Sequence, residues 1–442
     1  MFYPSNAIGA VRPTNFAKYL TLLNHNIVVV TEEEFVYQEY KLNGTEFFRI
    51  PNSTIIQRFK KLVREKKSTE SKNARSIEKK CNKLGVDSST FRWRLDLTNF
   101  YKKSRRQIFS LIIELDWLLN SKRLLRKRFS KYHFDVVISS YGPISSLLLG
   151  YSILRLKLAR YWISDLRDNL INEDNPFWMN LLYRKIGRQI IKYAHSITLV
   201  SYGQKAMFER VHKVKASINN KIAVVSNGFE GNVAKVQAKY NDGVLRIAYT
   251  GQLYSGKRDL TLLFHVIDDL VEEMKVDVSR IRFIYAGPNG EELKEQVKNF
   301  KNVESACEDL GSVSRQEAFE LQNRSDLLVA LTWNTIMEQG ILTGKVYEYL
   351  KAYKPIIALT SGDLPNGELT NMVENLRLGI ACEYLSYNED YKRLRDFLIL
   401  QYYNLIEGRI NDYSPNIDRL EGYKYENIVN ILNKIIEKVV KV

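Results

Sequence analysis

Four short segments of the chain combine residue types that could bind a phosphorylated or hydroxyl-bearing ligand. The first, residues 249–259, places two glycines ahead of Lys257 and Arg258, just before an expected helix. Glycine lets the backbone turn closely, and the free N–H groups of a helix N-terminus together with nearby cations suit a diphosphate. We expect Gly251, Lys257 and Arg258 to bind such a group. A strand–helix turn with two solvated cations is the alternative for these residues alone.

The second segment, residues 342–350, predicts a helix N-terminus that carries a cation. Thr343 can cap the helix, Lys345 lies in its first turn, and Glu348 follows three residues later on the same face. A cation at a helix N-terminus opposes the helix dipole, so an anion such as phosphate should compensate it. Glu348 would then suit a pair of sugar hydroxyls. A surface ion pair is the alternative. A phosphate loop of the NTPase kind is excluded, because Val346 occupies the position that needs Ser or Thr.

The third segment, residues 161–169, is an apolar strand that ends in Asp165, Arg167 and Asp168. Two carboxylates beside a guanidinium favour a general base or a ligand for substrate hydroxyls about as much as a structural ion pair. Either aspartate could have the catalytic role.

The fourth segment, residues 5–12, precedes an expected helix at 14–23. Gly9 would allow close backbone approach, and Arg12 could contact a phosphate, in a loop that would serve the acceptor or a phosphate group. A plain turn is a strong alternative, because few residues precede this segment and its strand would be limited to residues 1–3.

The rest of the chain alternates short β-branched runs with longer helical patterns, which is typical of parallel α/β sheets. The expected strands are 27–31, 136–140, 161–164, 196–201, 222–225, 246–250, 282–286, 327–331 and 355–359. In such sheets ligands bind beyond the carboxyl ends of the strands, where all four segments fall.

A polar stretch, residues 230–243, lacks apolar periodicity and precedes a new strand at Leu245, so we interpret it as an interdomain linker. We expect one α/β domain over 1–230, a second over 244–415, and a C-terminal piece, 416–442, that ends in an amphipathic helix. The cleft between two such domains is the default ligand site.

Positive charge is concentrated in one part of the chain. The 442 residues include 66 Lys and Arg and 50 Asp and Glu; residues 57–132 hold 23 and 7 of these, which leaves 43 of each elsewhere. The formal net charge of +16 therefore belongs to this stretch, which we interpret as a basic helical insertion. Aromatic residues such as Phe109 and Trp117 lie between the cations. This combination favours an anionic membrane surface over duplex DNA, with a solvated helix face as the alternative.

Several kinds of site are not expected. The three cysteines, at positions 81, 307 and 382, lie far apart, so neither a disulfide framework nor a zinc site is indicated. No Asp-x-Asp triplet occurs, and we expect no metal. The chain start lacks the features of a signal peptide, and the longest uncharged run, 136–154, is interrupted by Gly142 and Pro143. We therefore expect a cytoplasmic protein without a membrane span.

The order of these motifs resembles that of GT-B glycosyltransferases and is most similar to glycosyltransferase family 4. The resemblance extends over nearly the whole chain and is strongest over 134–379. Its most specific signals are Thr250-Gly251-Gln252-Leu253 with Lys257, Tyr285-Ala286-Gly287, Gly311-Ser312-Val313 and Gly344-Lys345-Val346-Tyr347-Glu348-Tyr349. The first half matches through Gly9 with Arg12, Asp165-Leu166-Arg167-Asp168 and Asn227-Gly228-Phe229.

The resemblance implies two Rossmann-like parallel-sheet domains that face each other across a cleft, with a C-terminal helix that crosses back to the N-terminal domain. It implies a UDP- or GDP-linked sugar as donor substrate, no cofactor, and retention at the anomeric carbon. Lys257 would hold the diphosphate, and Gly287 and Val313 would line the nucleoside site. The residues expected to bind the donor are Gly251, Lys257, Arg258, Gly287, Val313, Thr343, Gly344, Lys345 and Glu348.

The chain departs from the family pattern at two places. The family often has two glutamates eight residues apart, but Gly340 lies eight residues before Glu348, and Glu338 is out of register. Many relatives have a histidine where this chain has residues 165–168. We therefore leave open which aspartate of that segment orients the sugar or the acceptor.

Together these features predict a hexosyl- or N-acetylhexosaminyltransferase of capsule- or O-antigen-type polysaccharide synthesis. Its acceptor would be lipid-linked or a glycan, and it would lie at the inner face of the cell membrane. A nucleotide-sugar 2-epimerase on the same fold is the first alternative, although the carboxylates and histidines that its proton chemistry needs are few here. A nucleic-acid-binding protein is the second, and it leaves Lys257, Lys345 and Glu348 unexplained.

Overall fold

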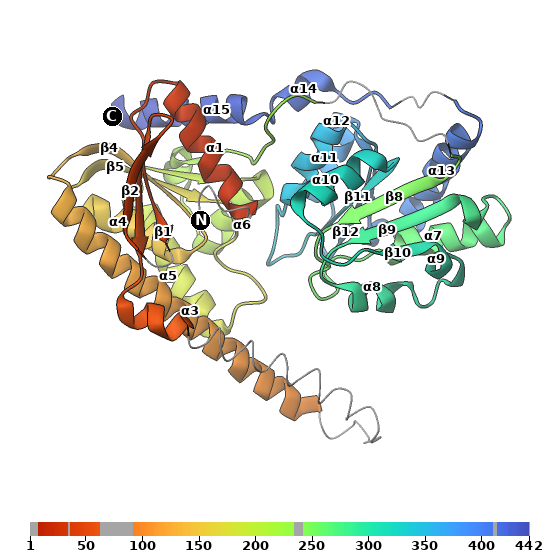
Figure 1. The fold of residues 1–442 in the computed structure, drawn as a ribbon, viewed down its shortest axis with the longest axis horizontal. Coiled ribbons are helices and arrows are strands. Elements are labelled where there is room, and N and C mark those ends of the chain that lie inside the picture. The colour runs from red at the N-terminus through yellow and green to blue at the C-terminus, as the bar shows by residue number, and fades with distance from the viewer. Residues whose placement is uncertain (1–7, 34–35, 62–91, 234–241, 410–412, 442) are drawn as a thin grey trace. The chain divides into compact units, whose positions relative to one another are not determined.

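The computed structural model describes residues 8–33, 36–61, 92–233, 242–409 and 413–441 (Figure 1). By its contacts the chain divides into two compact units, Met1–Thr198 with Ile435–Val442, and Leu199–Lys434. This division passes through a strand, whereas the predicted domain ranges, 1–230, 244–415 and 416–442, separate the chain in loops. Those ranges stay a prediction.

Two sheets are built from the first half of the chain. In the smaller sheet, β1 (Val28–Glu33) pairs in parallel with β3 (Thr45–Pro51), and β2 (Gln38–Leu42) pairs antiparallel to β3. The larger sheet has the order β4 (Phe134–Ser140), β5 (Ala159–Leu166), β6 (Ser196–Leu199), β7 (Ile222–Val224). The five strands predicted in this half are confirmed. β2 and β3 are additional strands whose sequences mix charged and apolar residues, without the β-branched run that marks the others.

The helices of the first unit precede, connect and cover these strands. They are α1 (Ile8–Leu22), a short helix at residues 54–61, α3 (Arg92–Arg128), α4 (Ile144–Arg155) and α5 (Phe177–Tyr193). Within the described residues, no helix combines the length and the apolar character that crossing a bilayer requires.

α1 begins six residues before the predicted helix at 14–23, so Gly9 and Arg12 lie inside the helix and not in a preceding loop. Pro13 lies within α1 and has no N–H, which leaves the Gly9 carbonyl without its helical donor. The guanidinium of Arg167 supplies a donor in its place, because Nη1 donates to Gly9 O. The loop prediction was wrong because this compensating donor comes from a residue 158 positions away.

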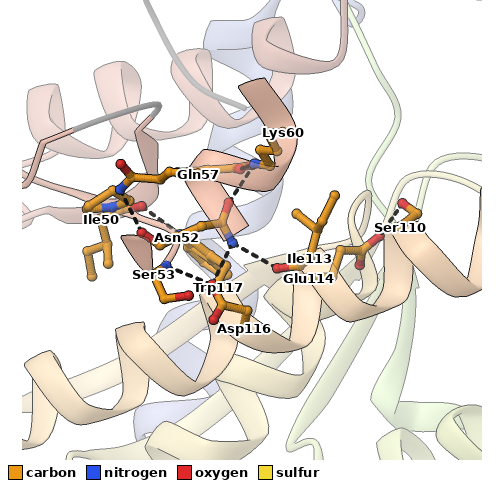
Figure 2. A network of polar contacts seen from close by, with 12 residues as sticks. Ile50, Asn52, Ser53, Gln57, Lys60, Ser110, Ile113, Glu114, Asp116 and Trp117 are labelled. Carbon is orange, nitrogen blue, oxygen red and sulfur yellow. Dashed lines mark hydrogen bonds and ion pairs between the residues drawn. The ribbon is translucent and has the colours of Figure 1, made fainter. Parts of the chain in front are cut away.

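A polar network fixes α3 against β3 and the helix at 54–61 (Figure 2). Asn52 donates to Ile113 O at 2.9 Å and to Asp116 Oδ2 at 3.2 Å, and Ser53 N donates to Asp116 Oδ2 at 2.8 Å. Trp117 is buried and donates from Nε1 to the Ile50 carbonyl at 2.9 Å. Its interpretation as a membrane-facing aromatic was therefore wrong. Residues 62–91 of the basic stretch lie outside the described residues.

Six parallel strands form the sheet of the second unit, in the order β10-β9-β8-β11-β12-β13. The strands are β8 (Leu245–Thr250), β9 (Ile281–Ala286), β10 (Cys307–Asp309), β11 (Leu327–Trp333), β12 (Ile356–Ser361) and β13 (Gly379–Glu383). The four strands predicted here are confirmed, and β10 and β13 are additional. The strand order reverses at β8, between β9 and β11, and such a switch point is where ligands bind in open parallel sheets.

The helices of the second unit are α6 (Tyr202–His212), α7 (Thr261–Glu272), α8 (Gly290–Val297), α9 (Lys301–Ala306), α10 (Arg315–Arg324), α11 (Gly344–Ala352), α12 (Glu368–Leu376), α13 (Tyr387–Ile406) and α14 (Ile417–Glu421). The predicted C-terminal helix is α15 (Tyr425–Lys441), which the division between the two units crosses.

One face of the second-unit sheet carries small alanine side chains, which leave room for the large tyrosine side chains of α11. Ala330, Ala358 and Ala381 stand in register across β11, β12 and β13. They belong to the same hydrophobic cluster as Tyr347 and Tyr349 of α11, each 1% exposed. Close packing leaves few voids, so the alanine row sets how near α11 lies to the sheet. The N-terminus of α11, which carries predicted site residues, is positioned by this packing.

We expect Ala358→Leu to lower the free energy of unfolding by about 1–3 kcal/mol, because added methylenes in a packed layer force side chains off their rotamers. Ala216, which is exposed, provides the control: Ala216→Leu should change stability by less than about 0.5 kcal/mol. Urea unfolding followed by circular dichroism measures both. Equal midpoints for the two variants would contradict the packing argument.

Candidate functional site

The predicted donor residues follow the carboxyl ends of neighbouring strands in the second unit. β8 ends at Thr250 and β11 at Trp333, and the segments that contain Lys257 and Lys345 come after them. The loops are tied to one another, since Ser361 Oγ at the end of β12 donates to Lys257 O at 2.6 Å. The structure therefore gathers at one edge of the sheet residues that are separated by up to about a hundred positions in the sequence.

Gly251 and Gly287 are packed against one another by the Tyr285 hydroxyl. Gly251 N donates to Ala286 O at 2.9 Å, and Tyr285 OH donates to Gly251 O at 3.0 Å. A Cβ atom built on Gly287 would lie 2.0 Å from Gly251 O, so only glycine fits there. Packing between two loops thus accounts for Gly287 without any ligand. The nucleoside contact expected of it stays a prediction.

Lys257 forms an ion pair with the buried carboxylate of Glu338, a residue that does not fit the expected eight-residue spacing before Glu348. Its Nζ lies 2.6 Å from Glu338 Oε2 and 5.1 Å from the centroid of the Trp333 ring. Trp333 Nε1 donates to the same carboxylate oxygen at 2.7 Å. Glu338 is 5% exposed, whereas the Lys257 side chain keeps 22% of its surface accessible. Glu338 is therefore a residue of this site that the eight-residue spacing rule misses by two positions.

Arg258 supports the loop from within. It is buried, and its Nη1 donates to Gln252 O at 2.9 Å and to Tyr249 OH at 3.2 Å. The three residues before Lys257 all have left-handed backbone, with φ of 56° at Tyr254, 54° at Ser255 and 84° at Gly256. Such conformations are costly for residues other than glycine, and tertiary contacts must hold them. Arg258, predicted to bind the donor, is occupied by these internal contacts.

The N-terminus of α11 has the arrangement that the sequence predicts. Thr343 Oγ1 accepts from Lys345 N at 3.1 Å and so caps the helix. Lys345 Nζ lies 3.1 Å from Glu348 Oε2, and Arg315 Nη2 lies 3.3 Å from Glu348 Oε1. Gly344 is the first residue of α11. The helix end therefore presents one carboxylate between two cations, beside N–H groups that have no helical acceptor.

Val313 reaches this edge through the helix that follows it. It is half-buried and lies directly before Ser314, the N-cap of α10, whose side chain accepts from Glu317 N. Arg315, in the first turn of α10, makes the ion pair with Glu348. The loop of Val313 thus lies next to the N-terminus of α11, as the nucleoside-site prediction requires, although no contact of Val313 itself tests that role.

In the first unit, Asp165 is fully buried and saturated with hydrogen bonds. Arg12 donates to both carboxylate oxygens, from Nη2 at 2.7 Å and from Nε at 3.1 Å. Ser140 Oγ and Thr198 Oγ1 each donate at 2.7 Å. Burial raises the pKa of Asp165, but the Arg12 charge and these donors outweigh it and hold the pKa below its ordinary value. Arg12 is 2% exposed, so neither partner of this pair is presented to a ligand.

Arg167 joins three segments of the first unit. Besides Gly9 O, it donates from Nη2 to Gly142 O at 2.6 Å, and its Nε lies 3.7 Å from Asp168 Oδ2. The side chain of Asp168 is 71% exposed. The residues of segment 165–168 therefore have different roles. Asp165 and Arg167 hold neighbouring segments together, and Asp168 is the carboxylate that a ligand can reach.

Two further groups at this edge have no signal in the sequence. Tyr141 follows β4, donates from its N–H to Asp165 O at 2.8 Å, and packs edge-on against Tyr183 with ring centroids 6.4 Å apart. Glu114 of α3 accepts from Ser145 N at 3.2 Å in the first turn of α4. Burial raises the pKa of Glu114 above its ordinary value. In the sequence Glu114 is only one of the few acidic residues of a basic stretch.

Among the residues that the structure describes, no three or more histidine, cysteine, aspartate or glutamate side chains are grouped so that they could hold a metal ion. The ion pairs at the second-unit edge join Lys257 to Glu338, and Lys345 and Arg315 to Glu348. An anion that enters this edge would therefore compete with carboxylates for partly exposed ammonium groups.

The sequence matches no known family profile and no curated protein. Solved structures are similar over almost the full length. A trehalose-6-phosphate synthase, from a study of glycosyltransfer with retention by bisubstrate glycomimetics, has a TM-score of 0.60 at 10% identity, with 98% of this chain and 97% of that chain covered. A structure described as trehalose-6-phosphate from E. coli bound with UDP-2-fluoro glucose has a TM-score of 0.59 at 12% identity, covering 100% and 98%.

A third structure, the α,α-trehalose 6-phosphate synthase of Burkholderia multivorans, has a TM-score of 0.56 at 10% identity, with 98% of this chain and 93% of that chain covered. The chain has the GT-B fold. At these identities the likeness concerns the fold, and the predicted α/β architecture of two Rossmann-like parallel-sheet domains is confirmed.

We expect Asp165→Asn to destabilise the protein by about 3–5 kcal/mol, because it leaves the buried Arg12 guanidinium without its counter-charge. Asp168→Asn, three residues away and exposed, should change stability by less than about 0.5 kcal/mol. Since folding lowers the pKa of Asp165, its contribution is present at neutral pH and is lost as the pH falls below about 4. The difference between wild type and Asp165→Asn in urea unfolding should accordingly shrink at pH 3. Equal stability of both variants at pH 7 would contradict the structural role of Asp165.

Proposed function

We propose that this protein is a glycosyltransferase that moves a sugar from a UDP- or GDP-linked donor to a lipid-linked or glycan acceptor. One observation carries the proposal: Lys257 and Lys345 follow neighbouring strands at the switch point of the second sheet, and each side chain is partly exposed, with its ammonium group beside a carboxylate. The likeness in fold to a structure bound with UDP-2-fluoro glucose supports a nucleotide-sugar as the donor class.

In the proposed mechanism, the donor diphosphate lies between the loop of Lys257 and the N-terminus of α11. Lys257, Lys345 and the positive end of the α11 dipole stabilise the negative charge that develops on the departing diphosphate. These groups supply the stabilisation without a metal ion. Glu348, held between Lys345 and Arg315, accepts hydrogen bonds from the ribose hydroxyls. As the diphosphate approaches, it takes over part of the interaction that Lys257 makes with Glu338.

On the acceptor side, Asp168 is proposed as the carboxylate that orients an acceptor hydroxyl. Exposure favours it over Asp165, whose two oxygens are occupied by four donors. Retention at the anomeric carbon is proposed on the likeness to the synthase described with retaining glycosyltransfer. The resemblance of the motifs to glycosyltransferase family 4 supports a role in capsule- or O-antigen-type polysaccharide synthesis, at the inner face of the cell membrane.

Lys257→Ala should lower kcat by about 10²–10³-fold, because it removes a fixed charge at the departing diphosphate. Glu348→Gln should lower kcat/KM chiefly by raising KM for the donor, because it weakens binding of the ribose. Release of the nucleotide from a panel of UDP- and GDP-sugars, with and without membrane lipid extract, measures turnover. Lys294→Ala and Glu291→Gln, which remove an exposed ion pair of α8, are matched controls and should retain activity.

Full activity of Lys257→Ala and Glu348→Gln would refute the proposed donor site. Formation of a new nucleotide-sugar isomer without acceptor would instead indicate the epimerase, and loss of activity in EDTA would refute the metal-free mechanism.

Asp168→Asn should reduce transfer to the acceptor by about 10²-fold or more while the affinity for donor nucleotide stays unchanged, because Asp168 belongs to the first unit and the donor lysines to the second. Asp174→Asn, an exposed aspartate six positions further on, is the matched control. The measurements are the initial rate of transfer and nucleotide binding by calorimetry. A variant with normal transfer would exclude Asp168 from catalysis.

A further inference from the structure

The outer side of α3 carries a row of large aliphatic side chains that no described part of the protein covers. Ile108, Ile112, Leu115 and Leu119 recur at intervals of four, three and four residues, so they share one face of the helix. Their exposed fractions are 49%, 49%, 46% and 62%. Single exposed apolar residues are ordinary, but a continuous row on one helix marks an interaction surface. We call these four residues the apolar row.

The apolar row continues into positive charge. The same spacing of three or four residues reaches Arg105 before Ile108, Lys122 and Arg123 after Leu119, and then Arg126. All four are exposed. In the described side chains of α3 the acidic residues are Glu114 and Asp116, and both are engaged inward, with Ser145 N and Ser53 N respectively. The outward face is therefore apolar and cationic.

The short helix at residues 54–61 adds to this surface. Ile55 and Phe59, one turn apart, are 79% and 45% exposed. The ring of Phe59 contacts Phe109 of α3, with centroids 4.9 Å apart. Arg58 and Lys61 are exposed on the same helix. Two neighbouring helices thus present the same combination of apolar and basic side chains.

α3 cannot turn the apolar row inward, because its opposite side is fixed. Trp117 and Leu125 are 6% and 2% exposed and pack in a cluster with Phe48, Leu149 and Ile153. The hydrogen bonds of Asn52 and Asp116 hold the helix at a set rotation (Figure 2). Figure 1 shows α3, in orange, along an edge of the first unit. The row is consequently a permanent feature of the folded protein.

We propose that the apolar row is a membrane-insertion face, with α3 lying in the interface of an anionic bilayer. The aliphatic side chains would enter the acyl boundary while Arg105, Lys122 and Arg126 contact lipid headgroups. Charge complementarity selects this occupant over a second copy of the chain, since two copies would bring like charges together around the row. The inference rests on the proposed function only for the reason that a lipid-linked acceptor resides in a membrane.

This inference differs from attraction by charge alone in its response to salt. Exposed charges lose most of their mutual interaction at high ionic strength, whereas burial of apolar surface persists. Full-length protein should therefore sediment with vesicles of 30% phosphatidylglycerol in phosphatidylcholine at low salt. About a tenth or more of that binding should persist at 0.5 M NaCl.

The triple variant Ile112→Gln/Leu115→Gln/Leu119→Gln should weaken vesicle partitioning about tenfold or more at both salt concentrations. The triple variant Lys122→Gln/Arg123→Gln/Arg126→Gln should weaken it at low salt only. The matched control, Met274→Gln/Leu400→Gln/Ile431→Gln, removes three exposed apolar side chains from the second unit and should bind as wild type does.

Three outcomes would overturn the inference. They are normal partitioning of the apolar-row variant, complete loss of wild-type binding at 0.5 M NaCl, and a wild-type dimer in light scattering that the apolar-row variant abolishes without any vesicle binding. Donor nucleotide binding, measured by thermal shift, should be equal in all the variants, because none alters the second-unit edge at Lys257 and Lys345. Failure of the membrane inference and failure of the proposed function are thereby distinguished.

Discussion

A charge that leaves water must be neutralised where it lies, and this constraint determines the roles of the polar residues at both sheet edges. Asp165 and Arg12 satisfy it completely: both are buried, and four donors occupy the carboxylate. Lys257 and Lys345 satisfy it only partly, each with one carboxylate near it and about a quarter of the side chain exposed. A saturated pair fixes strand ends, whereas a partly exposed pair can exchange its partner for a ligand. The same chemistry therefore gives structure in the first unit and, at the proposed donor site, an exchangeable ion pair in the second.

The sequence predicts the α/β fold well because apolar, β-branched runs mark most of its strands, and all nine runs predicted as strands are strands in the structure. It fails where long-range contacts override local pattern. β2 is exposed along most of its length and has no apolar run. α1 includes Pro13 because Arg167 replaces the missing donor at Gly9. Neither the exposed edge strand nor the distant guanidinium leaves a trace in the surrounding sequence.

Among the site residues, too, those whose arrangement is local can be predicted from the sequence, and those that depend on long-range contacts cannot. The cap by Thr343 and the pair of Lys345 with Glu348 are local, within five residues, and spacing alone predicts them. The choice between Asp165 and Asp168 is not local, because the saturation of Asp165 depends on Arg12, Ser140 and Thr198. Glu338 shows the opposite case. The expected eight-residue spacing from Glu348 excludes it, but the loop after β11 still brings its carboxylate to Lys257. The path of that loop, and not the number of residues before α11, determines where the carboxylate lies.

Counting charges along the sequence locates the excess of cations, but it does not show which residues lie on which face of α3. In α3 one turn directs Leu115 outward and Glu114 inward, to the first turn of α4. α4 follows Tyr141, whose backbone holds the end of β5 just before the exposed Asp168. A helix transmits position rigidly along its length, so a membrane contact on the outer side of α3 would also set the orientation of the loops that follow β4 and β5. The basic segment would then be more than an electrostatic anchor, because Glu114 contacts α4, the helix that follows the edge at which the acceptor is proposed to bind.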